Sequence, residues 1–504
     1  MLLHDIVTTS GAVAATRSRK AKVAAIVELL ARAEVDELEV VTAYLGGTLL
    51  QRRTGLGWRG LTTLPPPAES PSLEVREVDA AFAALSILSG AGSQAARSAA
   101  VVELFGRATA EEQAWLRGVV TGEVRQGALD ALVQEAVAAA AGVHLTAVRR
   151  AAMLSGSTVS VARTAFTGGE EALAAVGLEV LRPVLPMLAS SAPSVSEAMT
   201  KAGKEGPVSI DTKLDGIRIQ VHRDGDTVRI ATRTLEDITA RLPEVVEVAL
   251  GLPASSFVLD GEALALDESG RPRPFQETAS RTAQASGVHV TPYFFDLLHL
   301  DGTDLLEAPL TERVAALEGL VPGEHLTERV VTDDPEEAET FVARVLAAGH
   351  EGVVVKDPSA PYDAGRRGAS WVKVKPVHTL DLVVLAVEWG SGRRRGWLSN
   401  IHLGARDESN ESGFVMLGKT FKGMTDEVLA WQTERFLALE THREGHVVHV
   451  RPEQVVEIAI DGVQRSPRYP AGMALRFARV VRYRDDKTPA EADTVQTVRE
   501  LFER

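Results

Sequence analysis

The sequence contains no cysteine, which excludes disulfides, thiolate catalysis and cysteine-ligated zinc. Its 12 histidines form no His-x-His or His-Glu-x-x-His pattern, so their spacing suggests no histidine metal site. No apolar run approaches the roughly 18 residues needed to cross a bilayer. The first residues also lack the basic and long apolar segments of a secretory signal. We therefore expect a cytoplasmic protein whose metal, if it binds one, is a hard cation such as Mg²⁺ held by carboxylates.

The chain also lacks an excess of basic residues: it has 54 Lys and Arg against 69 Asp and Glu, which gives a net charge of −15. Such a total does not suggest nucleic-acid binding. A local basic groove remains compatible with it, because counterion release depends on the charges at the contact. The length of 504 residues exceeds one ordinary core, and about three domains are expected.

Changes in composition divide the chain into three parts. Residues 1–197 are rich in Ala, Leu and Val at helical spacing and predict an all-α domain that ends at a Ser/Pro-rich linker. Residues 198–377 mix short β-branched runs with helical patterns and predict an α+β domain. Residues 378–504 carry several short strands with turn signals, which predict a small β-barrel. The fold class is thus multidomain α+β.

Local signals place individual elements within these parts. Thr109 and Glu112 have the spacing of a capping box and predict the start of a helix. Residues 217–222 and 227–232 predict a hairpin around an Asp-Gly-Asp turn. Asp334 and Gly349 have the residue types that begin and end a helix, with Pro335 in its first turn.

Residues 209–218 carry the most suggestive chemistry. Lys213 follows β-branched residues and is followed by Gly216 and Arg218. A neutral lysine amine can attack phosphorus when the target is held in line, and nearby cations favour the neutral form. Glycine permits close backbone approach to a ligand, and an arginine fork binds phosphate or a ribose hydroxyl. The alternative is an exposed Leu-Asp-Gly turn with ordinary surface charges.

Carboxylates and further lysines follow on other predicted strands. Asp260 and Glu262 lie two positions apart and hence on one face of a strand, where they suit a divalent cation or a ribose hydroxyl; the alternative is a solvent-facing edge. Glu351 heads another strand. Lys373 and Lys375 share a strand face and could hold phosphate, although a solvated face gives the same pattern.

Three further stretches could meet a ligand. The aromatic strand at 292–298 is usual for a core, although one ring could stack on a purine. Residues 476–487 alternate five cations with apolar residues, as expected of a strand that packs on one side and meets phosphate on the other. In the helical part, glycines and arginines gather at helix ends, where they could grip a nucleic-acid backbone or act as plain caps.

In type and in order along the chain, these motifs resemble those of the ATP-dependent DNA ligases of the covalent nucleotidyltransferase superfamily. The resemblance covers residues 205–504 strongly. The first 200 residues are similar to the DNA-binding domain of the family more weakly, through Arg117-Gly118 and residues 122–128. It implies a helical DNA-binding domain at 1–197, an adenylation domain at 198–377 and an OB-fold barrel at 378–504. NAD-dependent ligases carry a cysteine-ligated zinc module, which this chain cannot build.

The resemblance also implies a role for each matched residue. Lys213 would attack the α-phosphorus of ATP and form a lysyl-AMP. Glu262 would serve the ribose or a metal, and Glu351 would help to hold Mg²⁺. The other nucleotide-site residues that it implies are Asp211, Arg218, Arg233, Phe295 as the ring on adenine, Arg367, Lys373, Lys375, and Arg482 and Lys487 of the barrel.

The implied partner is nicked duplex DNA, bound by a monomer near the nucleoid, in replication, repair or recombination. The expected DNA-binding residues are Arg117, Arg125, Arg149 and Arg150. The barrel is expected to turn about a hinge near residues 375–380, because one site cannot present the same face to pyrophosphate and to DNA. An RNA ligase, a capping-type nucleotidyltransferase and an inactive DNA-end-binding protein remain as alternatives.

Overall fold

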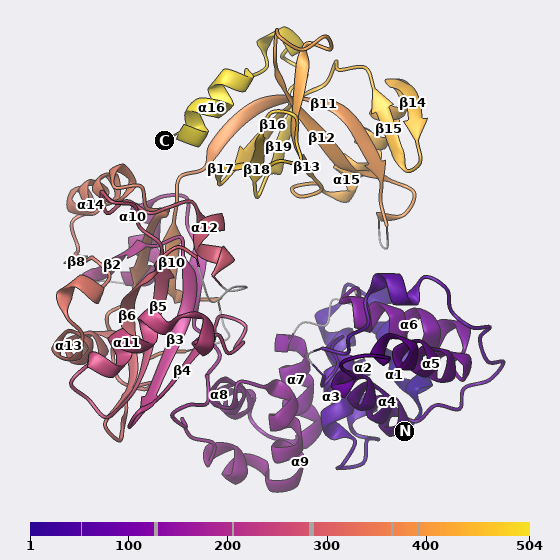
Figure 1. The fold of residues 1–504 in the computed structure, drawn as a ribbon, viewed down its shortest axis with the longest axis vertical. Coiled ribbons are helices and arrows are strands. Elements are labelled where there is room, and N and C mark those ends of the chain that lie inside the picture. The colour runs from indigo at the N-terminus through magenta and orange to yellow at the C-terminus, as the bar shows by residue number, and fades with distance from the viewer. Residues whose placement is uncertain are drawn as a thin grey trace.

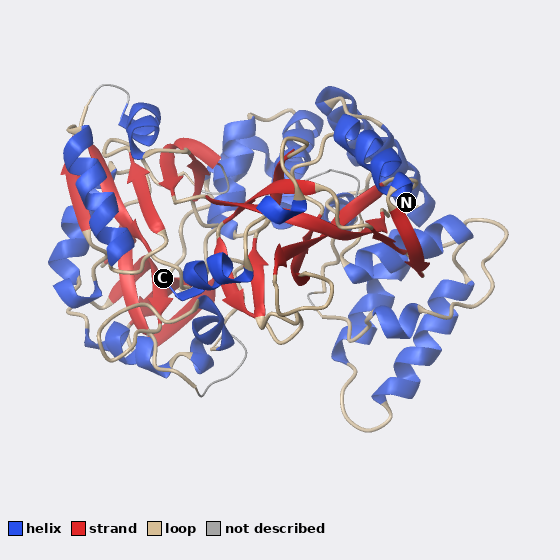
Figure 2. Cartoon of the chain, turned by 90° about the horizontal axis from the view of Figure 1, so that it is seen from above, coloured by secondary structure: helices blue, strands red, loops and turns tan. Residues whose placement is uncertain are grey.

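The computed structural model describes residues 1–51, 53–124, 130–203, 206–281, 287–363, 367–391 and 394–503. The chain forms a helical domain, a central domain of two sheets and a C-terminal barrel, which lie at the three corners of a triangle (Figure 1). Figure 2 shows the strands gathered in the central domain and the barrel. The expected multidomain α+β fold class is confirmed. Within the described ranges, no helix has both the length and the apolar composition that a membrane span requires.

The helical domain packs around one apolar core, in which Tyr44 and Trp115 lie with ring centroids 5.3 Å apart. The expected capping box is confirmed: the Thr109 hydroxyl accepts from the Glu112 amide, and the Glu112 carboxylate accepts from the Thr109 amide at 2.8 Å. The helices are α1 (Leu3–Ala15), α2 (Arg19–Leu30), α3 (Leu38–Leu45), α4 (Val75–Ile87), α5 (Ser93–Gly106), α6 (Ala110–Thr121), α7 (Asp130–Ala141), α8 (Leu145–Ser155) and α9 (Thr158–Ala174).

The described part of the central domain contains two five-stranded sheets. The first has the order β1-β10-β9-β2-β8 and the second the order β4-β3-β5-β6-β7. The strands of the first are β1 (Leu188–Ser191), β10 (Arg367–Val374), β9 (Gly352–Lys356), β2 (Val208–Lys213) and β8 (Arg329–Thr332). The strands of the second are β4 (Thr227–Thr232), β3 (Ile217–Asp224), β5 (Ser256–Leu264), β6 (Thr291–Leu300) and β7 (Thr303–Asp304). The expected hairpin is β3–β4.

Helices cover the outer face of each sheet, so the two inner faces are turned toward each other. Apolar residues of α10 (Val195–Gly203) and α14 (Pro335–Ala347) pack on the first sheet. Those of α11 (Pro243–Gly251) and α13 (Leu310–Leu320) pack on the second, and the short α12 (Phe275–Ser280) follows β5. Asp334 caps α14 as the sequence predicts.

Strand β1 pairs with β10 in parallel. Residues 188–191 therefore lie in a central sheet, although the expected domain boundary falls after residue 197. The Ser/Pro-rich stretch that predicts a linker leads directly from β1 into α10.

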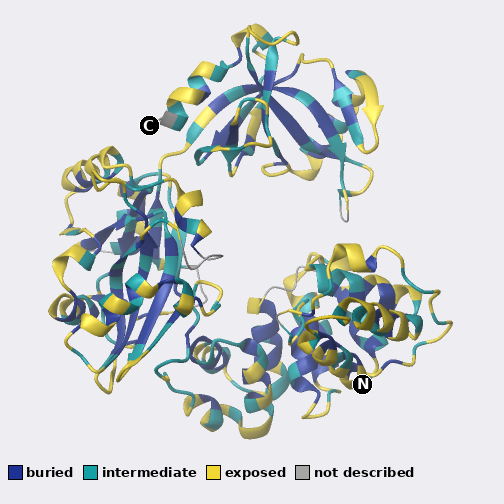
Figure 3. Ribbon diagram, in the orientation of Figure 1, coloured by how far each residue is buried: buried dark blue, intermediate teal, exposed yellow. Residues whose placement is uncertain are grey.

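The C-terminal domain is an OB-like barrel with a short hairpin at its side. Its large sheet has the order β13-β12-β11-β15-β14, with β16 pairing both β11 and β19. Figure 3 shows buried residues running through the strands of this sheet. The elements are β11 (His378–Trp389), β12 (Leu398–Arg406), β13 (Phe414–Thr420), α15 (Asp426–Ala438), β14 (Glu440–Glu444), β15 (Val447–Val450), β16 (Val455–Ile460), β17 (Gly462–Arg465), β18 (Met473–Arg476), β19 (Arg479–Tyr483) and α16 (Val495–Glu503).

Each domain is joined to the other two by at least one ion pair, so the three domains form a closed ring. Helical and central domains meet through Arg150 and Glu307 at 3.5 Å, and central domain and barrel through Arg476 and Asp215 at 2.9 Å. The barrel meets the helical domain through Arg17 and Asp426 at 2.6 Å. The last two side chains are 80% and 51% exposed, so their pair contributes at most about 1 kcal/mol.

A fully buried ion pair holds α13 against the second sheet. Arg313 donates to both oxygens of Asp296 at 2.7 and 3.0 Å, and neither side chain has any exposed surface. The guanidinium also donates to the carbonyls of Ala308 and Ala360. The aromatic strand β6 thus includes one buried carboxylate, whose charge is matched by an arginine of α13.

We expect Asp296→Asn to weaken this part of the central domain by about 3 kcal/mol or more, because it leaves the Arg313 charge buried and unmatched. Hydrogen exchange of the β6 and α13 amides should accelerate roughly a hundredfold. A matched double variant, Asp296→Leu with Arg313→Met, should lose less, because it removes both charges. Equal exchange rates in Asp296→Asn and in the unchanged protein would contradict this.

Candidate active site

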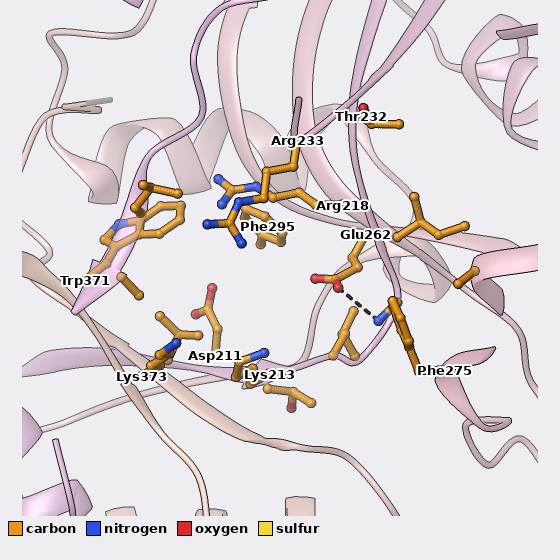
Figure 4. A pocket seen from close by; sticks show the side chains of 18 of the residues that line it. Asp211, Lys213, Arg218, Thr232, Arg233, Glu262, Phe275, Phe295, Trp371 and Lys373 are labelled. Carbon is orange, nitrogen blue, oxygen red and sulfur yellow. Dashed lines mark hydrogen bonds between the residues drawn. The ribbon is translucent and has the colours of Figure 1, made fainter. Parts of the chain in front are cut away.

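Lys213 lies at the end of β2, where the chain crosses from the first central sheet to the second. Beside it lies a cavity of about 580 Å³ between the two sheets. Figure 4 shows Lys213, Asp211 and Lys373 on one side of this cavity and Arg218, Arg233 and Glu262 on the other. The cavity is lined by these predicted residues: Asp211, Lys213, Arg218, Arg233, Glu262, Phe295 and Lys373.

The amine of Lys213 contacts the carboxylate of Glu351, which precedes β9. The same carboxylate accepts from Lys375 at 3.1 Å, and Lys375 also contacts Asp461 of the barrel. Burial opposes ionisation of Glu351, but the two lysines outweigh it and lower the pKa of this carboxyl. Glu351 is therefore an anion that orients the Lys213 amine, and the surface-turn alternative for Lys213 is wrong.

Arg218 is held rigidly at the cavity wall. It donates to both oxygens of Asp260, at 2.7 and 3.1 Å, and to the carbonyl of Met187 at 2.7 Å. The hydroxyl of Tyr362 donates to the same Asp260 at 2.6 Å. Asp260 is 1% exposed, so the alternative of a solvent-facing acidic edge is wrong for this residue. Its carboxylate positions the arginine, which leaves Glu262 as the acid of the pair that reaches the cavity.

Glu262 reaches the cavity from β5 and accepts from the Gly216 amide at 2.9 Å. A side chain at Gly216 would lie 2.3 Å from the Ala263 carbonyl, so only glycine allows this approach. Part of the Glu262 side chain faces the cavity, yet it lies deep in the protein. Burial, opposed by Lys213, the Gly216 amide and Arg218, raises the pKa of Glu262 to about 7. This carboxyl can thus change its charge near neutral pH.

Asp211 also lines the cavity, but its charge is fully matched by the protein. Arg329 donates to both its oxygens at 2.6 and 2.7 Å, and Lys356 lies 2.6 Å from one of them. Burial opposes ionisation, but these two cations outweigh it and lower the pKa of Asp211 to about 2. Asp211 is therefore an anchor for two cations beneath the cavity.

Aromatic rings and unmatched polar groups form the remaining wall. Phe295 and Trp371 meet edge to face with centroids 5.9 Å apart, and Lys356 lies 4.3 Å from the Trp371 centroid. Among the residues that the structure describes, no carboxylate lies within ion-pair distance of Arg233, which Figure 4 shows pointing into the cavity. The buried Thr212 hydroxyl likewise lacks a hydrogen-bond partner within the described ranges. Such a wall can stack a planar base and bind anionic oxygens.

Other predicted nucleotide-site residues lie away from the cavity. Arg482 pairs with Glu457 at 2.7 Å, and Lys487 pairs with Asp381, both within the barrel. The barrel approaches the central domain through Arg476 instead. For Arg367 the backbone begins β10, but its side chain lies outside the described residues.

The predicted DNA-binding arginines are spread over the helical domain. Arg117 lies over the ring of the exposed Trp58, 5.7 Å from its centroid. Arg149 pairs with Glu135 at 3.5 Å. Arg150 pairs with Glu307 and donates to the Val176 carbonyl, so it also joins two domains. Arg125 lies outside the described residues.

Several residues of the site carry no clear sequence signal. Arg329 is the first residue of the edge strand β8, and Lys356 is the last residue of the valine-rich strand β9. Their role comes from the pairing of β2 with both β8 and β9, which places them on either side of Asp211. The sequence shows Trp371 as an aromatic residue close to Lys373 and Lys375, but it does not predict that the ring lies against Phe295.

Comparisons with known proteins agree with the resemblance. Three family profiles match the chain: DNA ligase N terminus over residues 48–138, ATP dependent DNA ligase domain over 186–375, and ATP dependent DNA ligase C terminal region over 394–487. The probable DNA ligase of Nocardioides sp. is 73% identical and covers 100% of this chain and 99% of its own. That of Kineococcus radiotolerans is 68% identical and covers 99% of each.

A solved structure named Pmar-Lig_Pre supports the fold. It shares 18% identity with this chain, covers 95% of it and 99% of its own chain, and superposes with a TM-score of 0.64. The profiles and the two relatives span all three domains, so the rival nucleotidyltransferases and the inactive DNA-end binder are not needed to explain the motifs. This chain belongs to the ATP-dependent DNA ligase family.

Proposed function

We propose that this ligase seals 5′-phosphate/3′-hydroxyl nicks in duplex DNA through a lysyl-AMP formed on Lys213. The observation that carries the proposal is the position of the Lys213 amine. It lies at the wall of a cavity of about 580 Å³ that also presents arginines, lysines and an aromatic ring. A cavity of this size suits one nucleotide.

In the first step, the Lys213 ammonium gives a proton to water, and the neutral amine attacks the α-phosphorus of ATP. The nitrogen–phosphorus bond forms as the bond to the bridging oxygen breaks, pyrophosphate leaves, and the nitrogen gives a second proton to water. Lys373 and Arg218 stabilise the charge on the α-phosphate, and Phe295 stacks on adenine. Glu262 accepts from a ribose hydroxyl, and Arg233 and Arg367 bind the nucleotide. Asp211 acts through Arg329 and Lys356.

The later steps transfer AMP to DNA and then release it. A 5′-phosphate oxygen attacks the AMP phosphorus, the bond to Lys213 breaks, and the lysine regains a proton. The 3′-hydroxyl then attacks the 5′-phosphorus, closes the backbone and expels AMP. The first of these transfers occurs at the adenylyl phosphorus and the second at the DNA 5′-phosphorus, and at each centre positioning and charge stabilisation by the cations that line the cavity would supply the catalysis.

Glu351 and Glu262 would hold Mg²⁺. Glu351 contacts Lys213, and Glu262 interacts electrostatically with both Lys213 and Glu351. The pKa of Glu351 is lowered, while that of Glu262 is about 7. Carboxylate oxygens are the ligands that Mg²⁺ prefers, so the donor set fits. When bound, the ion supplies positive charge to the phosphates. A cation at Glu351 would also replace part of the charge that Lys213 and Lys375 now give to it.

DNA would be held by the helical domain through the predicted residues Arg117, Arg125, Arg149 and Arg150. Arg117, stacked on the exposed Trp58, is the best placed of the described three. The enzyme would act as a monomer in the cytoplasm, at the nucleoid, in replication, repair or recombination. A duplex can pass between the helical domain and the barrel only after the exposed Arg17–Asp426 pair opens.

The barrel would move between the steps about a hinge near residues 375–380. In the present arrangement it contacts the site through Arg476 and Asp461, whereas Arg482 and Lys487 lie on other barrel surfaces. Rotation about the hinge would bring the last two to the pyrophosphate, and a different rotation would free the cavity for DNA.

Lys213→Ala should acquire no covalent AMP when incubated with ATP labelled in its α-phosphate, because the attacking nitrogen is gone. Lys201→Ala, which removes an exposed lysine of α10, should be labelled as fully as the unchanged protein. Running the nick-sealing assay with ATP and NAD side by side tests the cosubstrate. Covalent AMP on the Lys213→Ala protein would overturn the mechanism.

Glu262→Gln should change how stability depends on pH. The carboxyl has its ordinary pKa of 4.5 when unfolded and about 7 when folded. Its contribution is therefore fully present below pH 4.5 and is lost as pH rises through 7. Glutamine removes this loss, so the variant should gain on the order of 2 kcal/mol relative to the unchanged protein between pH 5 and pH 8. Thermal unfolding at both values measures it, and parallel pH dependence would contradict it.

Locking the barrel in its present position should impair both steps. Gln276 of α12 donates to the Arg465 carbonyl of β17 at 3.3 Å. Cysteines at these two positions would be the sole thiols of the chain. A short bismaleimide cross-link should reduce both self-adenylation and nick sealing, because the locked barrel can neither bring Arg482 and Lys487 to the pyrophosphate nor leave the cavity to DNA. The same variant without cross-linker is the control. Full rates of both activities after cross-linking would refute the movement.

A further inference from the structure

Two histidines and one glutamate meet on the β14–β15 hairpin, at the side of the barrel away from β17 and β18 (Figure 1). His442 and His449 are directly opposite each other across the two antiparallel strands. Glu444 lies two residues beyond His442 and hence on the same face. One ligand atom from each side chain lies within 4.8 Å of the other two.

The orientation of the rings is suited to a shared ligand. The imidazoles are stacked with centroids 4.3 Å apart and an interplanar angle of 4°. The Nε2 atom of His442 lies 3.8 Å from one Glu444 oxygen, and that of His449 lies 3.7 Å from the other. These separations exceed a hydrogen bond. They approach the distance of about 3.4 Å between neighbouring ligand atoms around a tetrahedral zinc ion with bonds near 2 Å.

Thr441 sets the tautomer of His442. Its hydroxyl donates to the His449 carbonyl at 3.1 Å and lies 3.2 Å from Nδ1 of His442. A hydroxyl has one proton, so it can only accept from that nitrogen. Nδ1 of neutral His442 therefore carries the proton, and the lone pair of Nε2 points toward Glu444. Metal-binding histidines are oriented in this way by a hydrogen bond at the other ring nitrogen.

We propose that His442, Glu444 and His449 bind a first-row transition-metal dication of the Zn²⁺ type, with water in the fourth position. Imidazole nitrogens select such an ion over Mg²⁺, which prefers oxygen alone. This site is therefore distinct from the carboxylates at Glu262 and Glu351. In the described part of the sheet β14 pairs only with β15, and its residues are largely exposed (Figure 3). The bound ion would cross-link the edge strand β14 to β15.

Titration of the full-length protein without an affinity tag tests this directly. With Mg²⁺ in excess, calorimetry should find one equivalent of Zn²⁺ bound, and Zn²⁺ should raise the melting temperature. His442→Ala with His449→Ala should weaken binding by at least about tenfold and abolish that rise, because one ligand cannot hold the ion. Glu444→Gln should weaken it to a smaller degree. All three side chains are partly or well exposed, so these variants fold.

His144→Ala is the matched control. His144 also contacts a glutamate, Glu170, on an exposed surface, but it belongs to no described three-ligand group. Its Zn²⁺ binding should equal that of the unchanged protein. Nick sealing in Mg²⁺ alone should be the same with and without the two hairpin histidines, which separates this site from the catalytic one. Unchanged Zn²⁺ affinity in the double variant, or no saturable Zn²⁺ binding to the unchanged protein, would overturn the proposal.

Discussion

The arrangement of the candidate active site depends on the ion pairs that the Glu351 carboxylate forms with two lysines. This carboxylate contacts Lys213 at the end of β2 and Lys375 beyond the end of β10, and so joins two strands of one sheet beside the proposed nucleophile. Two ammonium groups this close would repel each other inside the protein without an anion between them. The attraction of the two lysines outweighs the effect of burial and lowers the pKa of Glu351, which favours the anion.

The same principle organises the rest of the cavity. Asp211 holds Arg329 and Lys356, and Asp260 holds Arg218, so each buried carboxylate fixes the cations beside it. Their charges are matched and their side chains are held in place before any nucleotide enters. Glu262 differs, because burial raises its pKa to about 7 and no cation of the described residues forms an ion pair with it. Paired carboxylates and cations thus surround one carboxyl, that of Glu262, whose charge can change when a ligand binds.

Lys375 also couples the cavity to the barrel, since it contacts both Glu351 and Asp461. Movement of the barrel therefore changes the charge next to Lys213. On the far side of the barrel, His442 and His449 illustrate what sequence spacing omits: they lie seven positions apart and match no familiar metal pattern. Antiparallel pairing of β14 with β15 puts them opposite each other, because register and not sequence separation decides which side chains share a face.

The sequence by itself determined the elements and the chemistry of the nucleotide site. Helix caps and turn residues act locally, and they predicted α6, α14 and the β3–β4 hairpin. The ordered motifs, through their resemblance to the ligase family, predicted seven residues that line the cavity. Only the tertiary structure decided that β1 joins the central sheet, that Arg329 and Lys356 hold Asp211, and that Arg476 and Asp461 are barrel residues in contact with the site. These contacts join distant segments, and their energies depend on burial and strand pairing, which no local pattern encodes.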